Sequence, residues 1–205
     1  LLSGIQPRII EIAILASYKA LHQFTWCDLL SIPDELAELE KMQIQEFQEE
    51  NNLRSNITIL QNIKDKTSLK VRNQYEVNPY PRWIDLGMNL NPKSISEVAK
   101  EINLKICNNQ IYKRKKLDIL IAGCGTGQHS IGSASRYKNC TITAIDLSLK
   151  SLAYAKRKTN EVGFTNIEYI QADILDLGNL NKKFDMIESA GVLHHMSDPL
   201  EGWKV

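Results

Sequence analysis

The sequence lacks several features that mark particular classes of protein. Its four cysteines form no CxxC pair and have no histidine at zinc-finger spacing, so neither a disulfide framework nor a metal site is predicted. Lys and Arg number 25 against 24 Asp and Glu, a balance that does not suggest nucleic acid or a membrane surface as partner. No apolar run reaches the roughly 18 residues of a spanning helix. We therefore expect a cytoplasmic protein that acts on a small molecule.

The character of the chain changes along its length. Residues 1–63 read as a helical N-terminal region, with apolar side chains at near-helical spacing and the features of a packing or interaction subdomain. Residues 64–116 read as a linker that contains a helix, which the two prolines of Asn78-Pro79-Tyr80-Pro81 end. Because the chain starts with Leu-Leu and stops just after Asp198-Pro199, which should open a helix, we expect a piece of a longer protein.

Residues 117–205 alternate between apolar strands and amphipathic helices. Strands are predicted at 117–122, 140–145, 167–171 and 183–189. Helices are predicted near 127–137, 149–161 and 176–182. This alternation indicates an α/β fold with a parallel sheet and right-handed crossovers. In such sheets, ligands bind at the carboxyl ends of the strands.

A glycine-rich loop follows the first of these strands. Gly123, Gly125 and Gly127 allow the backbone to turn tightly and to approach a ligand without an intervening Cβ. The dinucleotide-binding pattern GxGxxG would require a glycine at position 128, which is Gln128. The loop alone is weak evidence, because a structural turn also explains such a pattern.

Two acidic residues end the next two strands. Asp146 is placed to accept the hydroxyl hydrogens of a ribose, although a helix cap would explain it as well. Asp173, beside the aliphatic Ile174, would suit an adenine amino group, and a surface turn is the alternative. No Lys-Ser/Thr pair follows the glycines to hold phosphate. The ligand indicated is an adenosine without phosphates, a description that S-adenosyl-L-methionine (SAM) meets.

The loop AGCGTG (122–127), together with the segment SAGVLHHMSDP (189–199), resembles the class I SAM-dependent methyltransferases. The stretch VRNQYEVNPYPRW (71–83) is similar to a motif of bacterial tetratricopeptide-repeat-associated methyltransferases, whose repeats would lie upstream of Leu1. The resemblance implies a Rossmann-like sheet of seven strands in the order 3-2-1-4-5-7-6, of which this chain supplies the first four, in the order 3-2-1-4.

The resemblance also implies roles for single residues. The three loop glycines would line the methionine portion of SAM, with the carbonyl of Ser189 helping to hold its ammonium group. Asp146 would bind the ribose, and Asp173 with Ile174 the adenine. Gln128 and Leu147 complete the predicted cofactor site. Many family members carry an acid two positions before the first glycine, where this chain has Ile121.

The segment from Tyr75 to Trp83 suggests a lid. Arg82 would pair with the methionine carboxylate, and an aromatic face such as that of Tyr75 would meet the sulfonium. The alternative is that Tyr80 and Trp83 fasten the N-terminal helices to the sheet.

The predicted function is methyl transfer from SAM to an unidentified acceptor, a small molecule in preference to a protein. Holding the acceptor close to the methyl group and in line with it can supply much of the rate acceleration of such a reaction. If a base is used, His194 or His195 would take a proton from the acceptor. Pocket shaping is the competing role for these histidines. The alternative function is a non-catalytic SAM-binding or protein-interaction module, which Ile121 favours. A nicotinamide enzyme is third, disfavoured by Gln128.

Overall fold

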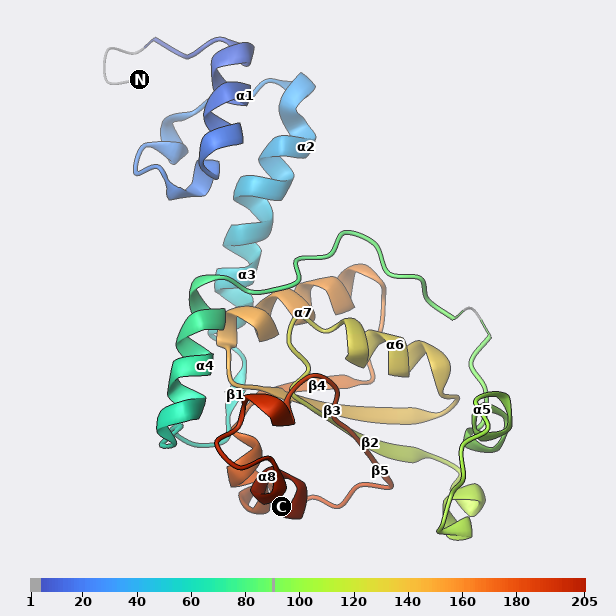
Figure 1. The fold of residues 1–205 in the computed structure, drawn as a ribbon. Helices are drawn as coiled ribbons and strands as arrows, with labels where there is room; N and C mark the ends of the chain where they lie inside the picture. The colour runs from blue at the N-terminus through green and yellow to red at the C-terminus, as the bar shows by residue number, and fades with distance from the viewer. Residues whose placement is uncertain (1–4, 90) are drawn as a thin grey trace. The chain divides into compact units, whose positions relative to one another are not determined.

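The structure, a computed structural model, describes residues 5–89 and 91–205 (Figure 1). The chain divides into two compact units, one that ends at Asn52 and one that begins at Leu53. Each unit has a hydrophobic cluster of its own. Within the described ranges, the helices are too short or too polar to span a lipid bilayer.

The first unit is helical in its described residues. Its elements are α1 (Ile9–Tyr18), η1 (Leu21–Gln23), η2 (Cys27–Leu29), η3 (Asp34–Leu36), α2 (Ala37–Glu40), the π-helical turn η4 (Lys41–Gln45) and the start of α3 (Glu46–Arg54). The side chain of Gln43 joins two of them, because it accepts from the Leu21 amide at 3.0 Å and donates to the Ala16 carbonyl at 3.2 Å. The unit is therefore held by polar as well as apolar contacts.

The second unit is built on a parallel five-stranded sheet in the order β1-β4-β3-β2-β5. The strands are β1 (Thr58–Ile59), β2 (Leu117–Ala122), β3 (Cys140–Asp146), β4 (Ile167–Gln171) and β5 (Met186–Glu188). The last four lie in the predicted order 3-2-1-4, which is confirmed. The strand β1 corrects the prediction that residues 1–63 are helical throughout. Two residues are too few to show a strand period, and β1 exists because it pairs with β4.

Helices and short helical turns surround this sheet. They are α4 (Lys66–Val77), α5 (Ile95–Glu101), η5 (Asn109–Lys113), α6 (Gln128–Arg136), α7 (Leu149–Glu161), η6 (Ile174–Leu180), η7 (Leu193–His195) and α8 (Pro199–Lys204). Side-chain caps begin several of them, including Ser148 at α7 and Asp198 at α8. The helix predicted at 176–182 is the 3-10 helix η6, which begins at the cap Asp173.

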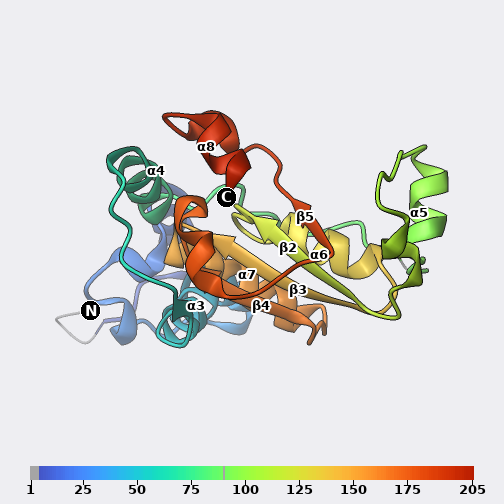
Figure 2. The ribbon, with the colours of Figure 1, turned by 90° about the horizontal axis from the view of Figure 1, so that it is seen from below.

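The two faces of the sheet pack against different partners (Figures 1 and 2). Ile119, Ile121 and Ile142 are buried on the face that α6 and α7 cover. Leu120 and Ile145 belong to a second cluster, which includes side chains of η6 and of the segment around η7. Because both faces are covered, the central strands are apolar along their length, as parallel strands require.

The Tyr80-to-Trp83 segment is fastened to the glycine-rich loop. The buried Trp83 indole donates to the Thr126 carbonyl at 3.0 Å, and the Thr126 hydroxyl donates to the Pro81 carbonyl at 2.6 Å. The Tyr154 hydroxyl of α7 donates to the Trp83 carbonyl. These contacts fix the position of Pro81 and Trp83 beside the loop.

The half-buried carboxylate of Glu188 holds the edge strand β5 to α6. Oε2 of Glu188 lies 2.8 Å from Nε2 of His129 and accepts from the Ser133 hydroxyl at 2.6 Å, while Oε1 accepts from the Tyr137 hydroxyl at 3.3 Å. Burial raises the pKa of Glu188, but the hydrogen bonds from His129 and Ser133 outweigh it, and the net pKa is lowered. The carboxylate is therefore stabilised in its charged form.

The buried position of Trp83 predicts a large loss of stability on truncation. Trp83→Ala should lower the free energy of unfolding by about 3–5 kcal/mol, because it removes a buried aromatic side chain and leaves a cavity. Trp203, which is 76% exposed against 8% for Trp83, provides a matched control. Trp203→Ala should change it by less than about 0.5 kcal/mol. Urea unfolding measures both, and equal losses would show that Trp83 does not anchor the segment.

The lowered pKa of Glu188 predicts a pH-dependent contribution to stability. Glu188→Gln should cost about 1.5–3 kcal/mol near pH 7, because it removes hydrogen bonds to a charged group. A lowered pKa in the folded state stabilises the fold above the ordinary glutamate value of about 4.3, and this stabilisation is lost as the pH falls through the lowered pKa. The difference between variant and parent should therefore shrink below about pH 4.

Glu168 serves as control for this measurement, because it pairs with Lys182 at 2.5 Å on the surface with 52% of its side chain exposed. Glu168→Gln should have little effect at any pH. A Glu188→Gln difference that persists unchanged at acid pH would contradict the assignment.

Candidate functional site

A cavity of about 370 Å³ opens at the carboxyl ends of the strands of the second unit. The sheet contributes the loop after β2, the end of β3 and its following residue, the residues after β4 and the segment between β5 and η7. Further lining comes from α4 and from Tyr80 and Pro81. Parallel α/β sheets bind their ligands at this edge. The location of the cavity therefore agrees with the site expected from the sequence.

The three loop glycines have different tasks. Gly123 and Gly125 line the cavity, whereas Gly127 does not. At Gly127, where φ is +88°, an added Cβ would lie 2.6 Å from the Cβ of Ala155 in α7. Gly127 thus allows the start of α6 to pack closely on α7. The structure does not place it where the methionine portion of a cofactor was predicted.

Asp146 connects the end of β3 to the glycine-rich loop. Its Oδ2 accepts from the Gly125 amide at 2.9 Å, and its Oδ1 accepts from the Ser148 amide at 2.9 Å. Burial raises the pKa of this carboxyl, and the amide hydrogen bonds oppose the shift. Asp146 and the following Leu147 both line the cavity. The helix cap of α7 is Ser148 and not Asp146, so the cap interpretation of Asp146 is wrong. Asp146 instead orders the glycine-rich loop and lines the cavity.

The end of β4 supplies the second acid. Asp173 is 3% exposed, lines the cavity with Ile174, and accepts from the Leu175 amide at 3.1 Å through Oδ1. The Gln171 side chain donates to the Leu147 carbonyl at 2.8 Å and so joins the ends of β3 and β4. An acidic and an aliphatic side chain are thereby presented next to each other.

Some residues of the Tyr75-to-Trp83 segment line the cavity, and others hold the segment in place. Tyr75, Tyr80 and Pro81 line the cavity. Arg82 does not, because its guanidinium lies over the Tyr154 ring at 4.5 Å from the ring centre. The structure thus does not bring Arg82 to the cavity, where the lid hypothesis placed it. Trp83 fastens the segment to the glycine-rich loop.

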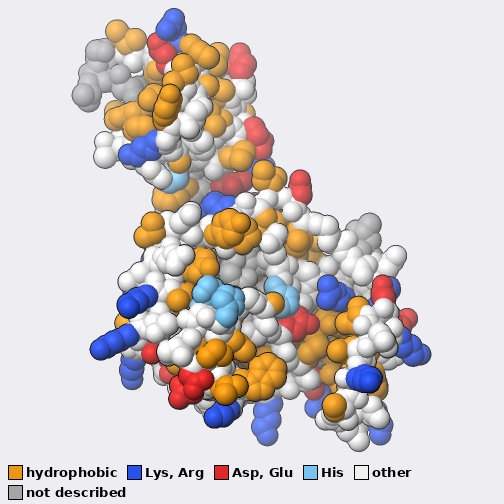
Figure 3. All heavy atoms as spheres, in the orientation of Figure 1, with side chains coloured by type: hydrophobic (Ala, Val, Ile, Leu, Met, Phe, Trp, Pro, Cys, Tyr) orange, Lys and Arg blue, Asp and Glu red, His pale blue; other side chains and the backbone are white. Residues whose placement is uncertain are grey.

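The residues after β5 are also divided. His195 lines the cavity, whereas His194 and Ser189 do not. The rings of the two histidines have centroids 4.1 Å apart, and the Ser189 hydroxyl donates to the Ala122 carbonyl at 3.1 Å. Histidine side chains appear in pale blue on the face seen in Figure 3. Of the two predicted histidines, only His195 is positioned to meet a ligand.

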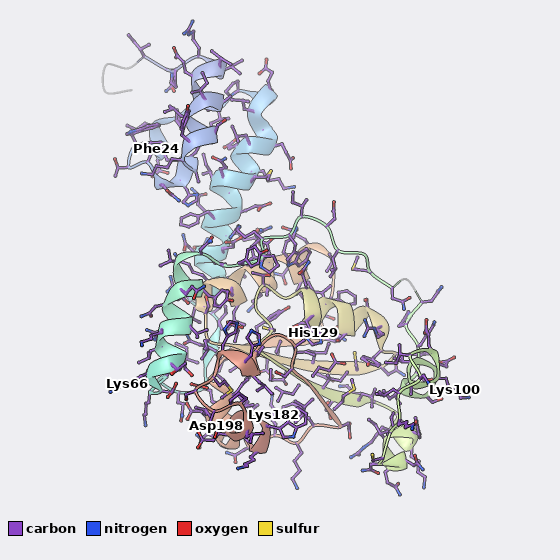
Figure 4. The ribbon with its side chains drawn as sticks, in the orientation of Figure 1. Phe24, Lys66, Lys100, His129, Lys182 and Asp198 are labelled. Carbon is purple, nitrogen blue, oxygen red and sulfur yellow. The ribbon has the colours of Figure 1, made fainter. Side chains whose placement is uncertain are left out.

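Sequence reasoning missed several wall residues. His129 lines the cavity from the first turn of α6 (Figure 4), and Gln128, which was predicted, lies beside it. Ser68 and Val71 of α4 also line the cavity, although they lie far from the glycine-rich loop in the sequence. The position of His129 directly after the glycine-rich loop was the available signal. For Ser68 and Val71 there was none, because only the packing of α4 brings them to the sheet.

The chemistry of the wall is acidic and apolar, with two histidines. Among the described residues that line it, none is Lys or Arg. No group of three or more His, Cys, Asp or Glu side chains within residues 5–89 and 91–205 is arranged to hold a metal ion. The acids Asp146 and Asp173 can accept hydrogen bonds from a neutral polar ligand, and Ile174 can pack on a flat ring.

Comparison with known proteins agrees with this chemistry. Residues 119–202 match a family model described as a methyltransferase domain. The match begins in β2 and ends in α8, so it includes the glycine-rich loop, Asp146, Asp173 and the segment after β5.

Similar proteins have also been found. An uncharacterized protein of Synechococcus is 40% identical over 97 residues, which are 47% of this chain and 23% of that protein. A release factor glutamine methyltransferase of Flavobacterium psychrophilum is 29% identical over 174 residues, 83% of this chain and 55% of that protein. The solved structure of magnesium protoporphyrin IX methyltransferase from Synechocystis with bound SAM gives a TM-score of 0.44 at 22% identity, covering 66% of this chain and 67% of that chain.

The chain spans about a quarter of the first relative's length and about half of the second's. The family match covers the ends of β2 to β5 and most of the residues that line the cavity, but not the lining residues of α4 or Tyr80 and Pro81. Residues 119–202 are therefore similar to a methyltransferase domain, for which S-adenosyl-L-methionine is the cofactor.

Proposed function

We propose that this protein transfers a methyl group from SAM to a small-molecule acceptor. The observation that carries the proposal is the pairing of Asp146 with the Gly125 amide at the edge of a cavity that Asp173 and Ile174 also line. This set of groups suits an adenosine with free ribose hydroxyls. The absence of Lys and Arg from the described lining does not suit a ligand with several phosphates.

The residues at the cavity fit SAM in one orientation. Ile174 would pack on the adenine and Asp173 would accept from its amino group. Asp146 would accept from the ribose hydroxyls, as acids at the end of the second strand do in related folds. Gly123 and Gly125, which carry no side chain, would leave space for the methionine portion. When bound, SAM would supply an electrophilic methyl group on its sulfonium.

The remaining wall is where we place the acceptor. Val71 and Tyr75 of α4 face the cavity, as do Val192, His195 and Met196 around η7. These side chains are largely apolar and favour an acceptor with an apolar or aromatic body. The enzyme would hold the nucleophile in line with the methyl group, and His195 would accept the proton that an oxygen or nitrogen nucleophile loses.

The alternative is a SAM-binding module without turnover. It is motivated by Ile121, which is fully buried in the core at a position where many family members carry an acid. Membership of the tetratricopeptide-repeat-associated subfamily is a proposal that rests on the motif at residues 71–83. Cytoplasmic location is likewise a proposal, supported by four cysteines that are all unpaired.

Asp146→Asn tests the cofactor site. The variant should bind S-adenosylhomocysteine about ten- to a hundredfold more weakly, because hydrogen bonds to a charged acceptor contribute roughly 1.5–3 kcal/mol. Calorimetric titration measures the dissociation constants. Asp198→Asn is the matched control, because Asp198 caps α8 and does not line the cavity. Urea unfolding of both variants separates loss of binding from loss of folding.

Failure of the unmodified protein to bind S-adenosylhomocysteine would refute the proposed function. Binding without methyl transfer from labelled SAM to any component of a small-molecule extract would instead favour the non-catalytic module.

His195→Ala tests proton transfer. Once an acceptor has been found with labelled SAM, the variant should lower kcat by about a hundredfold, at the lower end of what acid–base catalysis contributes. Its affinity for S-adenosylhomocysteine should remain within about threefold. His194→Ala should lower kcat much less, because His194 does not line the cavity. Equal effects of the two substitutions would assign His195 a packing role.

A further inference from the structure

The anionic end of SAM has no arginine or lysine partner in the described lining of the cavity. The methionine portion carries a carboxylate, which sequence reasoning had paired with Arg82. The guanidinium of Arg82 lies over the Tyr154 ring, and Arg82 does not line the cavity. Of the described lining residues, only His129 and His195 have side chains that can become cationic near neutral pH.

The two histidines lie at different parts of the wall. His195 belongs to η7, next to Met196 and the apolar residues assigned above to the acceptor. His129 follows Gln128 at the start of α6, two residues after Gly127, and therefore lies on the glycine-loop side (Figure 4). With the adenine at Ile174 and the ribose at Asp146, the methionine portion runs along Gly123 and Gly125 toward this helix start.

His129 is held in place by the same carboxylate that fastens β5 to α6. Its Nε2 lies 2.8 Å from Oε2 of Glu188, which also accepts from the Ser133 hydroxyl. Glu188 has 17% of its side chain exposed and His129 has 32%. The Nε2 edge of the imidazole thus faces a half-buried acid, while the residue still borders the cavity. Because Nε2 faces Glu188, Nδ1 is the ring nitrogen that can meet a ligand.

Glu188 lies in the sheet next to the position where many family members carry an acid. Glu188 on β5 is the register partner of Ile121 on β2. Ile121 stands where many family members carry an acid near the cofactor's methionine portion. In this chain an acid stands one strand away at the same level, beneath the first turn of α6. The negative charge is therefore present, but it acts on the cavity through His129.

We propose that His129, positioned by Glu188, binds the carboxylate of the cofactor's methionine portion. The inference rests on the proposed function, since it concerns the same cofactor. The imidazolium would donate its Nδ1 hydrogen to the ligand carboxylate while Nε2 donates to Glu188. The start of α6, a helix of nine residues, adds a favourable dipole for an anion at this point. His129 is a binding residue and Glu188 a positioning residue.

The test compares three ligands that differ only at the methionine end. S-adenosylhomocysteine carries the amine and the carboxylate, its decarboxylated analogue carries the amine alone, and 5′-methylthioadenosine carries neither. His129→Ala should weaken S-adenosylhomocysteine about ten- to a hundredfold, as expected for a charge-assisted hydrogen bond. Affinities for the other two ligands should stay within about threefold. Calorimetric titration of the full chain measures all three.

Two further variants sharpen the result. Glu188→Gln should reduce the ratio of affinities for S-adenosylhomocysteine and its decarboxylated analogue, a ratio that a merely structural role would not change. Arg136→Ala removes a full positive charge from the exposed end of the same helix and should leave that ratio unchanged. Circular dichroism confirms that each variant is folded, and His129→Gln provides a second substitution if His129→Ala is not.

The outcomes distinguish this inference from the proposed function. If the unmodified protein binds none of the three ligands, the cofactor site itself is refuted. If it binds all three with equal affinity, the cofactor proposal stands and recognition of the carboxylate is refuted. If His129→Ala and His129→Gln weaken all three ligands to the same extent, His129 has a structural role and the inference fails.

Discussion

The hydrogen bond from the Gly125 amide to the Asp146 carboxylate is the contact on which the candidate site depends. It joins the loop after β2 to the end of β3, so that two neighbouring strands present one continuous surface to a ligand. The same carboxylate also accepts from the Ser148 amide at the start of α7. One side chain therefore orders the loop, binds the amide of the residue that caps α7 and borders the cavity.

The loop is held from its other side by a segment far away in sequence. Trp83 and Pro81 form hydrogen bonds with Thr126, and Tyr154 of α7 fixes the Trp83 carbonyl. A glycine-rich loop has few side chains with which to order itself, and glycine loses much conformational entropy on folding. Contacts from two outside elements reduce that freedom in advance of ligand binding. The Tyr75-to-Trp83 segment thus serves the cavity both as wall and as support.

The charged side chains at the cavity lie at separate parts of its wall. Asp146 and Asp173 lie where neutral hydrogen-bond donors of an adenosine would meet them, and Glu188 is kept behind His129. Burial alone would favour the protonated form of Glu188, yet the donors around it lower its pKa. The polarity of the wall therefore changes along its length. Carboxylates lie at one part, and the imidazole of His129, in contact with Glu188, lies near the start of α6.

The sequence determined the sheet and most of the strand ends. Apolar runs and turn residues were enough to locate β2, β3 and β4 and to place Asp146 and Asp173 at strand ends, because these features are local. The order of these strands with β5 came from the resemblance to a known family. Only the tertiary structure decided the pairing of β1 and the positions of Ser68, Arg82 and Gly127 relative to the cavity. Three of these depend on a partner that is distant in the sequence: β4 for β1, Tyr154 for Arg82 and Ala155 for Gly127. A one-dimensional pattern carries no direct information about such pairings, since contact partners separated along the chain are chosen by the packing of the whole fold.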